Sequence, residues 1–370
     1  MTARKTWLRL LSGILLAGLL TACGGGTTGG GAVAPSGAAS DEAATGEAAT
    51  GGETTPPGGE AAASGGEAAA PGGEAATIRL GGLTGPTTMG MVRLLKDAQE
   101  GTSRNHYDFT LAGSADELTP KLVQGELDIA AVPANLAAVL YNRTGGGIGL
   151  LAVNTLGVLY VVETGDTVTA AADLRGKTIY ATGKGSTPEY VLRYILSANG
   201  LDPERDVTIE WKAEPAEVVA LLSQGGGVAM LPQPFVTVAQ GNLPNLRLAL
   251  NLTQEWEALD NGSLLITGVL VARTDFARDN PVLVREFLDE YRASTEYINA
   301  NLREGAQLVE EFGIVKAQVA EKAIPLCNIV YMEGEEMRQA ASGYLRVLYE
   351  QKAEAVGGAL PGDDFYLNLK

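Results

Sequence analysis

Residues 116–138 read DELTPKLVQGELDIAAVPANLAA, which contains a helix, a turn, a strand and the start of a second helix. Apolar residues at 115–124 have helical spacing, and the turn Gln124-Gly125-Glu126 ends that helix. Residues 128–132 form a short buried strand, and residues 136–141 are helical again. This order is typical of an α/β layer with a mostly parallel sheet.

The same order of helix, turn and strand recurs at residues 223–239, SQGGGVAMLPQPFVTVA. The other expected strands are 77–83, 107–112, 148–153, 156–162, 178–182, 207–211 and 228–231. Helices are expected at 188–199, 216–222 and 235–240, and an apolar return at 264–272 leads into a helical region. There, Val284, Phe287, Leu288 and Tyr291 share one helix face. The sequence therefore predicts two α/β units followed by packed helices.

The first residues, MTARKTWLRLLSGILLAGLLTAC, combine three basic residues with an apolar run at 10–20. Because that run is shorter than the roughly 20 residues that a membrane-spanning helix needs, residues 1–22 are predicted to be a secretion signal. Residues 20–23, LTAC, resemble the lipobox of bacterial lipoproteins, which implies that Cys23 is lipidated after cleavage. The alternative is that Cys23 simply follows an ordinary cleavage site.

Residues 23–76 consist almost wholly of Gly, Ala, Ser, Thr, Pro and Glu, with a seven-residue repeat of the type GGEAAAS from residue 58. Such a segment cannot bury enough apolar surface to offset its ordering entropy. We therefore expect a disordered tether between the lipid and the folded part. Cys327 is the only other cysteine, so no intramolecular disulfide is expected once Cys23 carries lipid.

The formal net charge is −17, of which about −13 belongs to the part beyond residue 76. This acidity argues against nucleic acid as a partner, because phosphate binding needs a basic face. The stretch TGKGST at 182–187 is not a phosphate-binding P-loop, because Gly185 rather than Ser or Thr follows Lys184. His106 is the single histidine, which leaves a zinc site or a histidine-based triad without partners. No catalytic residue, metal or cofactor is predicted.

Three stretches in this order, residues 116–138, 172–196 and 223–239, carry a resemblance to a known family. They resemble the substrate-binding proteins of nitrate/sulfonate/taurine-type ABC importers, which include receptors for thiamine pyrimidine precursors. The resemblance covers nearly all of residues 78–366. It implies a type II periplasmic-binding-protein-like α/β fold, bilobal, with two hinge strands joining lobes that close on a ligand. We expect lobe I to comprise 77–160 plus 266–370, and lobe II to comprise 161–265.

Ligands of open α/β sheets bind beyond the carboxyl ends of strands, where helix N-termini present free N–H groups. Residues 81–88 and 182–189 connect strand to helix in the two lobes; their glycines are expected to let backbone approach a ligand, with Thr187 as the N-cap of its helix. The predicted ligand contacts are Thr84, Gly85, Thr87, Thr88, Asn135, Thr155, Lys184, Ser186, Thr187 and Gln233. Further candidates are Trp256, Thr267, Asn328 and Tyr331. The alternative is that both loops are only tight, well-capped turns.

These observations predict a monomeric, extracytoplasmic lipoprotein that captures a small organic or weakly anionic solute. It would deliver that solute to the permease and ATPase subunits of an ABC importer, without covalent chemistry. One alternative is a sensor that reports ligand to a membrane kinase. Another is an enzyme like the intracellular pyrimidine-precursor synthase related to this fold, against which the export signal and the single histidine argue.

Overall fold

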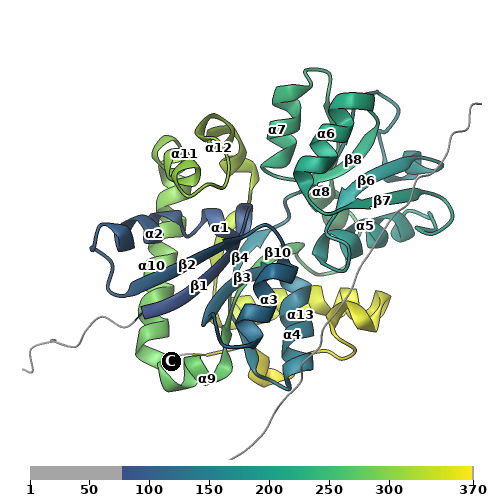
Figure 1. Cartoon of the computed structure of the whole chain (residues 1–370). Coiled ribbons are helices and arrows are strands. Elements are labelled where there is room, and N and C mark those ends of the chain that lie inside the picture. The colour runs from purple at the N-terminus through teal and green to yellow at the C-terminus, as the bar shows by residue number, and fades with distance from the viewer. Residues whose placement is uncertain (1–76, 369–370) are drawn as a thin grey trace, which may run out of the picture. The chain divides into compact units, whose positions relative to one another are not determined.

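The structure is a computed structural model that describes residues 77–368 (Figure 1). The predicted signal, Cys23 and the predicted tether lie outside the described residues. Across residues 77–368, no helix has both the length and the apolar character that crossing a membrane requires.

The first of two sheets has six strands in the order β11-β4-β10-β3-β1-β2. They are β1 (Thr77–Leu83), β2 (His106–Ala112), β3 (Ile129–Pro133), β4 (Ile148–Leu156), β10 (Ile266–Arg273) and β11 (Ile329–Met332). β3 and β4 are nearly continuous apolar runs, as expected for strands that are covered on both faces. This sheet forms the core of lobe I.

The second sheet has five strands in the order β7-β6-β8-β5-β9 and forms the core of lobe II. They are β5 (Leu159–Glu163), β6 (Thr178–Thr182), β7 (Thr208–Lys212), β8 (Val228–Pro232) and β9 (Arg247–Asn251). The helices of this lobe are α5 (Thr187–Ala198), α6 (Pro215–Gly225), α7 (Phe235–Asn242) and α8 (Leu252–Glu257).

The expectation of mostly parallel sheets is wrong. β1 runs parallel to β2 and β3, but β10 is antiparallel to β3 and β4, and β5 is antiparallel to β8 and β9. The reason is that β5 and β10 enter their sheets from the other lobe. Each therefore starts at the carboxyl ends of the parallel strands and runs in the opposite direction.

Helices cover the first sheet (Figure 1). The longest of them carries the predicted apolar stripe. They are α1 (Pro86–Met89), α2 (Val92–Gln99), α3 (Ala115–Val123), α4 (Ala134–Thr144), α9 (Thr274–Asp279), α10 (Pro281–Ala300), α11 (Leu302–Glu311), α12 (Ala317–Ala323) and α13 (Gly334–Gln351). Val284, Phe287, Leu288 and Tyr291 of α10 are buried against Ile78 and Leu80 of β1 and their neighbours, which confirms the packing role of that face. Val284, Phe287 and Leu288 each contribute roughly 1.5–3 kcal/mol of burial free energy.

The chain crosses from the first sheet to the second through Gly157 and Val158, which separate β4 from β5. A Cβ on Gly157 would lie 2.1 Å from Thr253 Oγ1, so only glycine fits at this crossing. Asn328, which has a left-handed φ of 44°, donates a hydrogen bond from Nδ2 to the Gly157 carbonyl at 2.5 Å. The lobe boundaries that we propose, at residues 161 and 266, fall within β5 and at the start of β10.

Candidate functional site

Buried polar side chains collect where the parallel strands of both sheets end. None of them is more than 8% exposed. In lobe I they are Thr87, Thr88, Asn135, Asn154 and Thr155, and in lobe II they are Thr182, Thr187 and Gln233. Neutral polar groups are costly to bury unless they form hydrogen bonds, so their partners show how this region is held.

The loop after β1 has one glycine with open space beside it. Gly85, at φ 153°, precedes α1, and a Cβ placed there would meet no heavy atom within 4 Å. The expectation that Gly81 and Gly82 let backbone approach a ligand is wrong, because both lie inside β1 and are packed against protein. A Cβ would lie 2.7 Å from Leu118 Cδ1 at Gly81 and 2.5 Å from Thr88 Oγ1 at Gly82.

Two of the predicted threonines of this loop use their hydroxyl hydrogens in hydrogen bonds that stabilise the loop. Thr84 donates its hydroxyl to the Ala112 carbonyl at 3.3 Å, and Thr88 donates to the Leu83 carbonyl at 2.6 Å. Each hydroxyl oxygen keeps the capacity to accept a hydrogen bond. Thr87 is buried and its carbonyl accepts from Asn154 Nδ2 at 3.0 Å.

Asn154 is the residue that links the loop to the end of β4. Its Oδ1 accepts from the hydroxyl of the predicted residue Thr155 at 3.1 Å, while its Nδ2 holds Thr87. The sequence interpretation missed Asn154, although an asparagine inside the apolar run LLAVNTL is a signal that could have found it. Thr87, Asn154 and Thr155 therefore form one connected polar group in lobe I.

The loop after β6 leads into α5 one residue earlier than expected. The helix starts at Thr187, so Ser186 rather than Thr187 is the N-cap, and its hydroxyl donates to the Gly183 carbonyl at 2.8 Å. Lys184 is exposed on the turn. Gly185, at φ 76°, has open space beside it, and its N–H donates to Glu189 Oε2 at 2.6 Å.

Asn135 joins the two lobes. It is fully buried at the first turn of α4, where Oδ1 accepts from the Thr187 hydroxyl at 3.2 Å. Its Nδ2 donates to the Ala355 carbonyl at 3.0 Å and makes a longer contact of 3.5 Å with the Gly185 carbonyl. The structure thus brings Asn135 together with the predicted loop of lobe II. Among the hydrogen bonds of residues 77–368, none connects the loop at 84–88 to lobe II.

Gln233 follows β8 and has one polar group without a partner, its side-chain NH2 group. Its Oε1 accepts from the Thr237 hydroxyl at 2.9 Å, and its backbone N–H donates to the Val158 carbonyl at 3.0 Å. Gln233 is 0% exposed, and its buried Nε2 has no hydrogen-bond partner. Thr237 also lines a cavity of about 400 Å³ between the lobes, formed by α7 and by residues of α12 and the turn after it.

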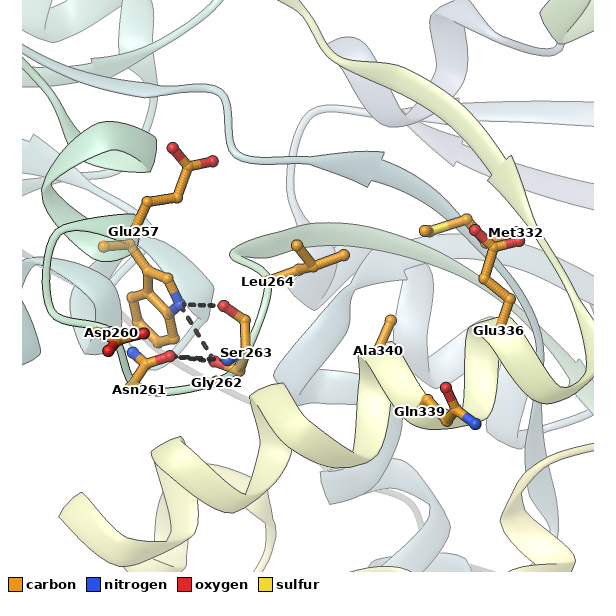
Figure 2. Close-up of a pocket in the computed structure, with 11 residues that line it drawn as sticks. Glu257, Asp260, Asn261, Gly262, Ser263, Leu264, Met332, Glu336, Gln339 and Ala340 are labelled. Carbon is orange, nitrogen blue, oxygen red and sulfur yellow. Dashed lines mark hydrogen bonds between the residues drawn. The ribbon is translucent and has the colours of Figure 1, made fainter.

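Another cavity, of about 440 Å³, lies beside the segment that returns from lobe II to lobe I (Figure 2). Figure 2 shows Leu264 of that segment between Ser263 on one side and Met332 and Ala340 on the other, and Trp256 also lines the cavity. Trp256 donates from Nε1 to Ser263, and its ring is packed 4.8 Å from that of Tyr194, centroid to centroid. The predicted ligand contacts do not line this cavity.

The further candidates have structural partners, with one exception. Trp256 is fully buried in the core, and Asn328 holds the crossing at Gly157. Tyr331 donates to Glu333 at 2.8 Å and lies under the guanidinium of Arg292. Thr267, in β10, has a buried hydroxyl oxygen without a partner.

A profile of the family described as "ABC transporter, phosphonate, periplasmic substrate-binding protein" matches residues 93–322. No curated protein matches the chain. An ABC transporter protein from Parabacteroides distasonis is 26% identical with a TM-score of 0.65, covering 79% of this chain and 99% of that one.

Two similar structures of lower identity support the fold alone. The alkanesulfonate-binding protein SsuA from Xanthomonas axonopodis pv. citri, bound to MOPS, is 15% identical with a TM-score of 0.62 over 78% of this chain and 96% of that one. The nitrate-binding protein NrtA from Synechocystis PCC 6803 is 16% identical with a TM-score of 0.54, over 71% and 75%. They confirm the predicted periplasmic-binding-protein-like α/β architecture.

The family profile spans more than half of the chain and includes strands of both sheets. Its members are solute-binding components that act outside the cytoplasm, which agrees with the resemblance found in the sequence. The chain belongs to the family of periplasmic substrate-binding proteins of phosphonate-type ABC transporters.

Proposed function

We propose that this receptor captures a small organic or weakly anionic solute between its lobes and delivers it to a membrane permease. The contacts come from Thr84, Gly85, Thr87, Thr88, Asn135 and Thr155 of lobe I and from Lys184, Ser186, Thr187 and Gln233 of lobe II. The receptor is a monomer. Lipid attached to Cys23 anchors it at the outer side of the membrane. The receptor binds and releases its solute without covalent chemistry.

The main support for this proposal is that the buried polar residues of the two lobes come into contact at Asn135. Its side chain hydrogen-bonds to Thr187 of lobe II while it remains fully buried. A solute that replaces or extends such contacts favours the closed arrangement by the difference in its affinity for the closed and open forms. Gln233 adds a buried donor, Nε2, that a solute oxygen or nitrogen would satisfy.

Solute capture is tested by a thermal-shift screen of the full chain against sulfonates, nitrate, pyrimidines, vitamins and amino-acid derivatives. Mass spectrometry of the molecules retained after purification identifies solutes outside that set. For the solute found, we expect Gln233→Leu to weaken affinity about tenfold, which corresponds to ~1.4 kcal/mol.

Gln254→Leu is the matched control, because Gln254 is an exposed glutamine of α8 in the same lobe. This variant should bind as the wild type does. The proposal is wrong if the full chain retains no small molecule and none of the compounds raises its melting temperature. Equal affinity in Gln233→Leu and the wild type would remove Gln233 from the site.

A further inference from the structure

The carboxylate of Glu189 occupies the start of α5, where the second-lobe loop meets its helix. Its Oε2 accepts the Gly185 N–H at 2.6 Å and its Oε1 accepts from Arg193 Nε at 2.7 Å. The side chain is only 9% exposed. Free N–H groups and the helix dipole make such a position attractive to anions. Here the protein's own carboxylate already holds it.

The nearby cation does not reverse this charge. Arg193 also pairs with Glu204, at 2.6 Å, so two carboxylates share one guanidinium. Lys184 is the only cation in the two candidate loops, and it is exposed on the turn, where water screens its charge. An anion that approached this loop would therefore meet the buried carboxylate of Glu189, whose only cationic partner among residues 77–368, Arg193, is already paired with Glu204.

The other buried charged groups are paired away from these loops. Asp128 is bound by Arg79 and Arg273, and Glu163 is bound by Arg247. The remaining buried polar side chains at the two strand edges are the neutral threonines, asparagines and glutamine described above. The site accordingly offers neutral hydrogen bonds and no buried cation of its own.

Gln233 provides an independent indication of what the solute presents. Gln233 follows β8, which pairs in parallel with β6, and the carboxyl end of β6 leads into the loop at 182–189. The unpartnered Nε2 of this fully buried glutamine is a donor. This donor calls for an acceptor on the solute, such as a carbonyl oxygen or a ring nitrogen.

We propose that the solute is uncharged where it meets lobe II and accepts a hydrogen bond there, and that Glu189 excludes phosphonates, sulfonates and nitrate. This inference rests on the proposed function and narrows it to an uncharged polar solute. Glu189 then acts as a specificity-determining residue. Its carboxylate occupies the N-terminus of the second-lobe helix, where an anionic solute would otherwise bind, and the fold of the receptor is unchanged.

The test is isothermal titration calorimetry of the full chain with methylphosphonate, methanesulfonate and nitrate. We expect the wild type to bind none of them at millimolar concentration. Glu189→Gln, which removes the charge, and Glu189→Ala, which also frees the Gly185 N–H, should bind methylphosphonate detectably at millimolar concentration, a gain in affinity of about tenfold or more. Glu204→Gln is the matched control, because Glu204 shares Arg193 but does not reach Gly185. It should behave as the wild type does.

Several outcomes overturn the inference while leaving solute capture intact. They are binding of any of the three anions by the wild type, no gain in either Glu189 variant, or an equal gain in Glu204→Gln. An anionic molecule retained by the purified wild type would do the same. If the wild type retains no molecule of any charge and no compound of the screen raises its melting temperature, the proposed function itself fails.

Discussion

At the scale of single residues, Glu163 shows how a buried charge is held in lobe II. Burial alone would raise the pKa of this carboxyl group. Hydrogen bonds from the Thr167 hydroxyl, the Val168 N–H and Arg247 outweigh burial and lower the pKa below its ordinary value of 4.5. The ionised carboxylate ties the end of β5 to the following loop and to β9.

This lowered pKa predicts a pH-dependent contribution to stability. The contribution is present above the unfolded-state pKa, near 4.5, and is lost as the pH falls through the lower folded-state value. Glu163→Gln should therefore lower the free energy of unfolding by about 1–3 kcal/mol at neutral pH and by much less near pH 3. Urea denaturation at a series of pH values measures the difference.

Glu210→Gln serves as the control, because Glu210 is exposed on β7 and paired only with Lys212. Its effect should stay within about 1 kcal/mol at every pH. A deficit in Glu163→Gln that is constant between neutral and acid pH would contradict the role given to the Glu163 carboxylate.

At the scale of elements, β10 and α1 approach closely at Gly268. A Cβ at this position would lie 2.3 Å from Thr87 Cγ2 and 2.7 Å from Asn154 Oδ1. These two residues belong to the polar group at the edge of lobe I. The lack of a side chain at Gly268 is therefore what allows the loop after β1 to pack on the sheet.

Gly268→Ala should destabilise the protein by about 1–3 kcal/mol through overpacking, and should weaken solute binding by displacing Thr87. Denaturation and calorimetry measure the two effects. Gly241→Ala, on α7, is the control, because a Cβ there meets no heavy atom within 4 Å. If Gly268→Ala is as stable as Gly241→Ala, the contact between β10 and α1 is less tight than described.

Much of the element pattern was predictable from local sequence. The strands at 77–83 and 178–182 were predicted with the bounds that β1 and β6 have. β9 (Arg247–Asn251), α8 (Leu252–Glu257) and β11 (Ile329–Met332) were not predicted. β9 depends on pairing with β5, which is distant in sequence.

The candidate site was only partly predictable, for a similar reason. Glycine, threonine and proline at strand-to-helix turns identify the two loops locally. Which hydrogen bonds those loops use depends on tertiary contacts: Asn154 binds Thr87 across 67 positions of sequence. Glu189 is only four residues from Gly185, but the turn that brings them together requires a positive φ at Gly185, which the sequence alone does not specify.

At the scale of the whole molecule, Asn135 and Asn142 offer a direct comparison, because both lie on α4 and bind the segment that follows α13. Asn142 donates to the Val356 and Ala359 carbonyls, each at 2.7 Å, and both of these partners belong to lobe I. Asn135 also accepts from Thr187 of lobe II. Of the two asparagines, therefore, only Asn135 forms a hydrogen bond that couples the two lobes.

We expect Asn135→Ala to shift the solute-free protein toward separated lobes, seen as a larger radius of gyration in small-angle X-ray scattering. The loss of a buried hydrogen bond should also cost about 1–3 kcal/mol. Asn142→Ala should lose comparable stability without a change in radius. Identical radii for the two variants would show that the contact between Asn135 and Thr187 does not influence lobe closure.

The two crossings between the sheets lie side by side, since Leu156 at the end of β4 pairs with Ile266 at the start of β10. β4 and β10 are antiparallel neighbours, which is the arrangement of a hairpin. Residues 157–265 are thus a domain inserted between the two strands of a hairpin. Two junctions, one after β4 and one before β10, define the segment that would be exchanged for that of another receptor. Recombination at these points can give a receptor a new solute preference while every strand and helix of the host half is inherited unchanged.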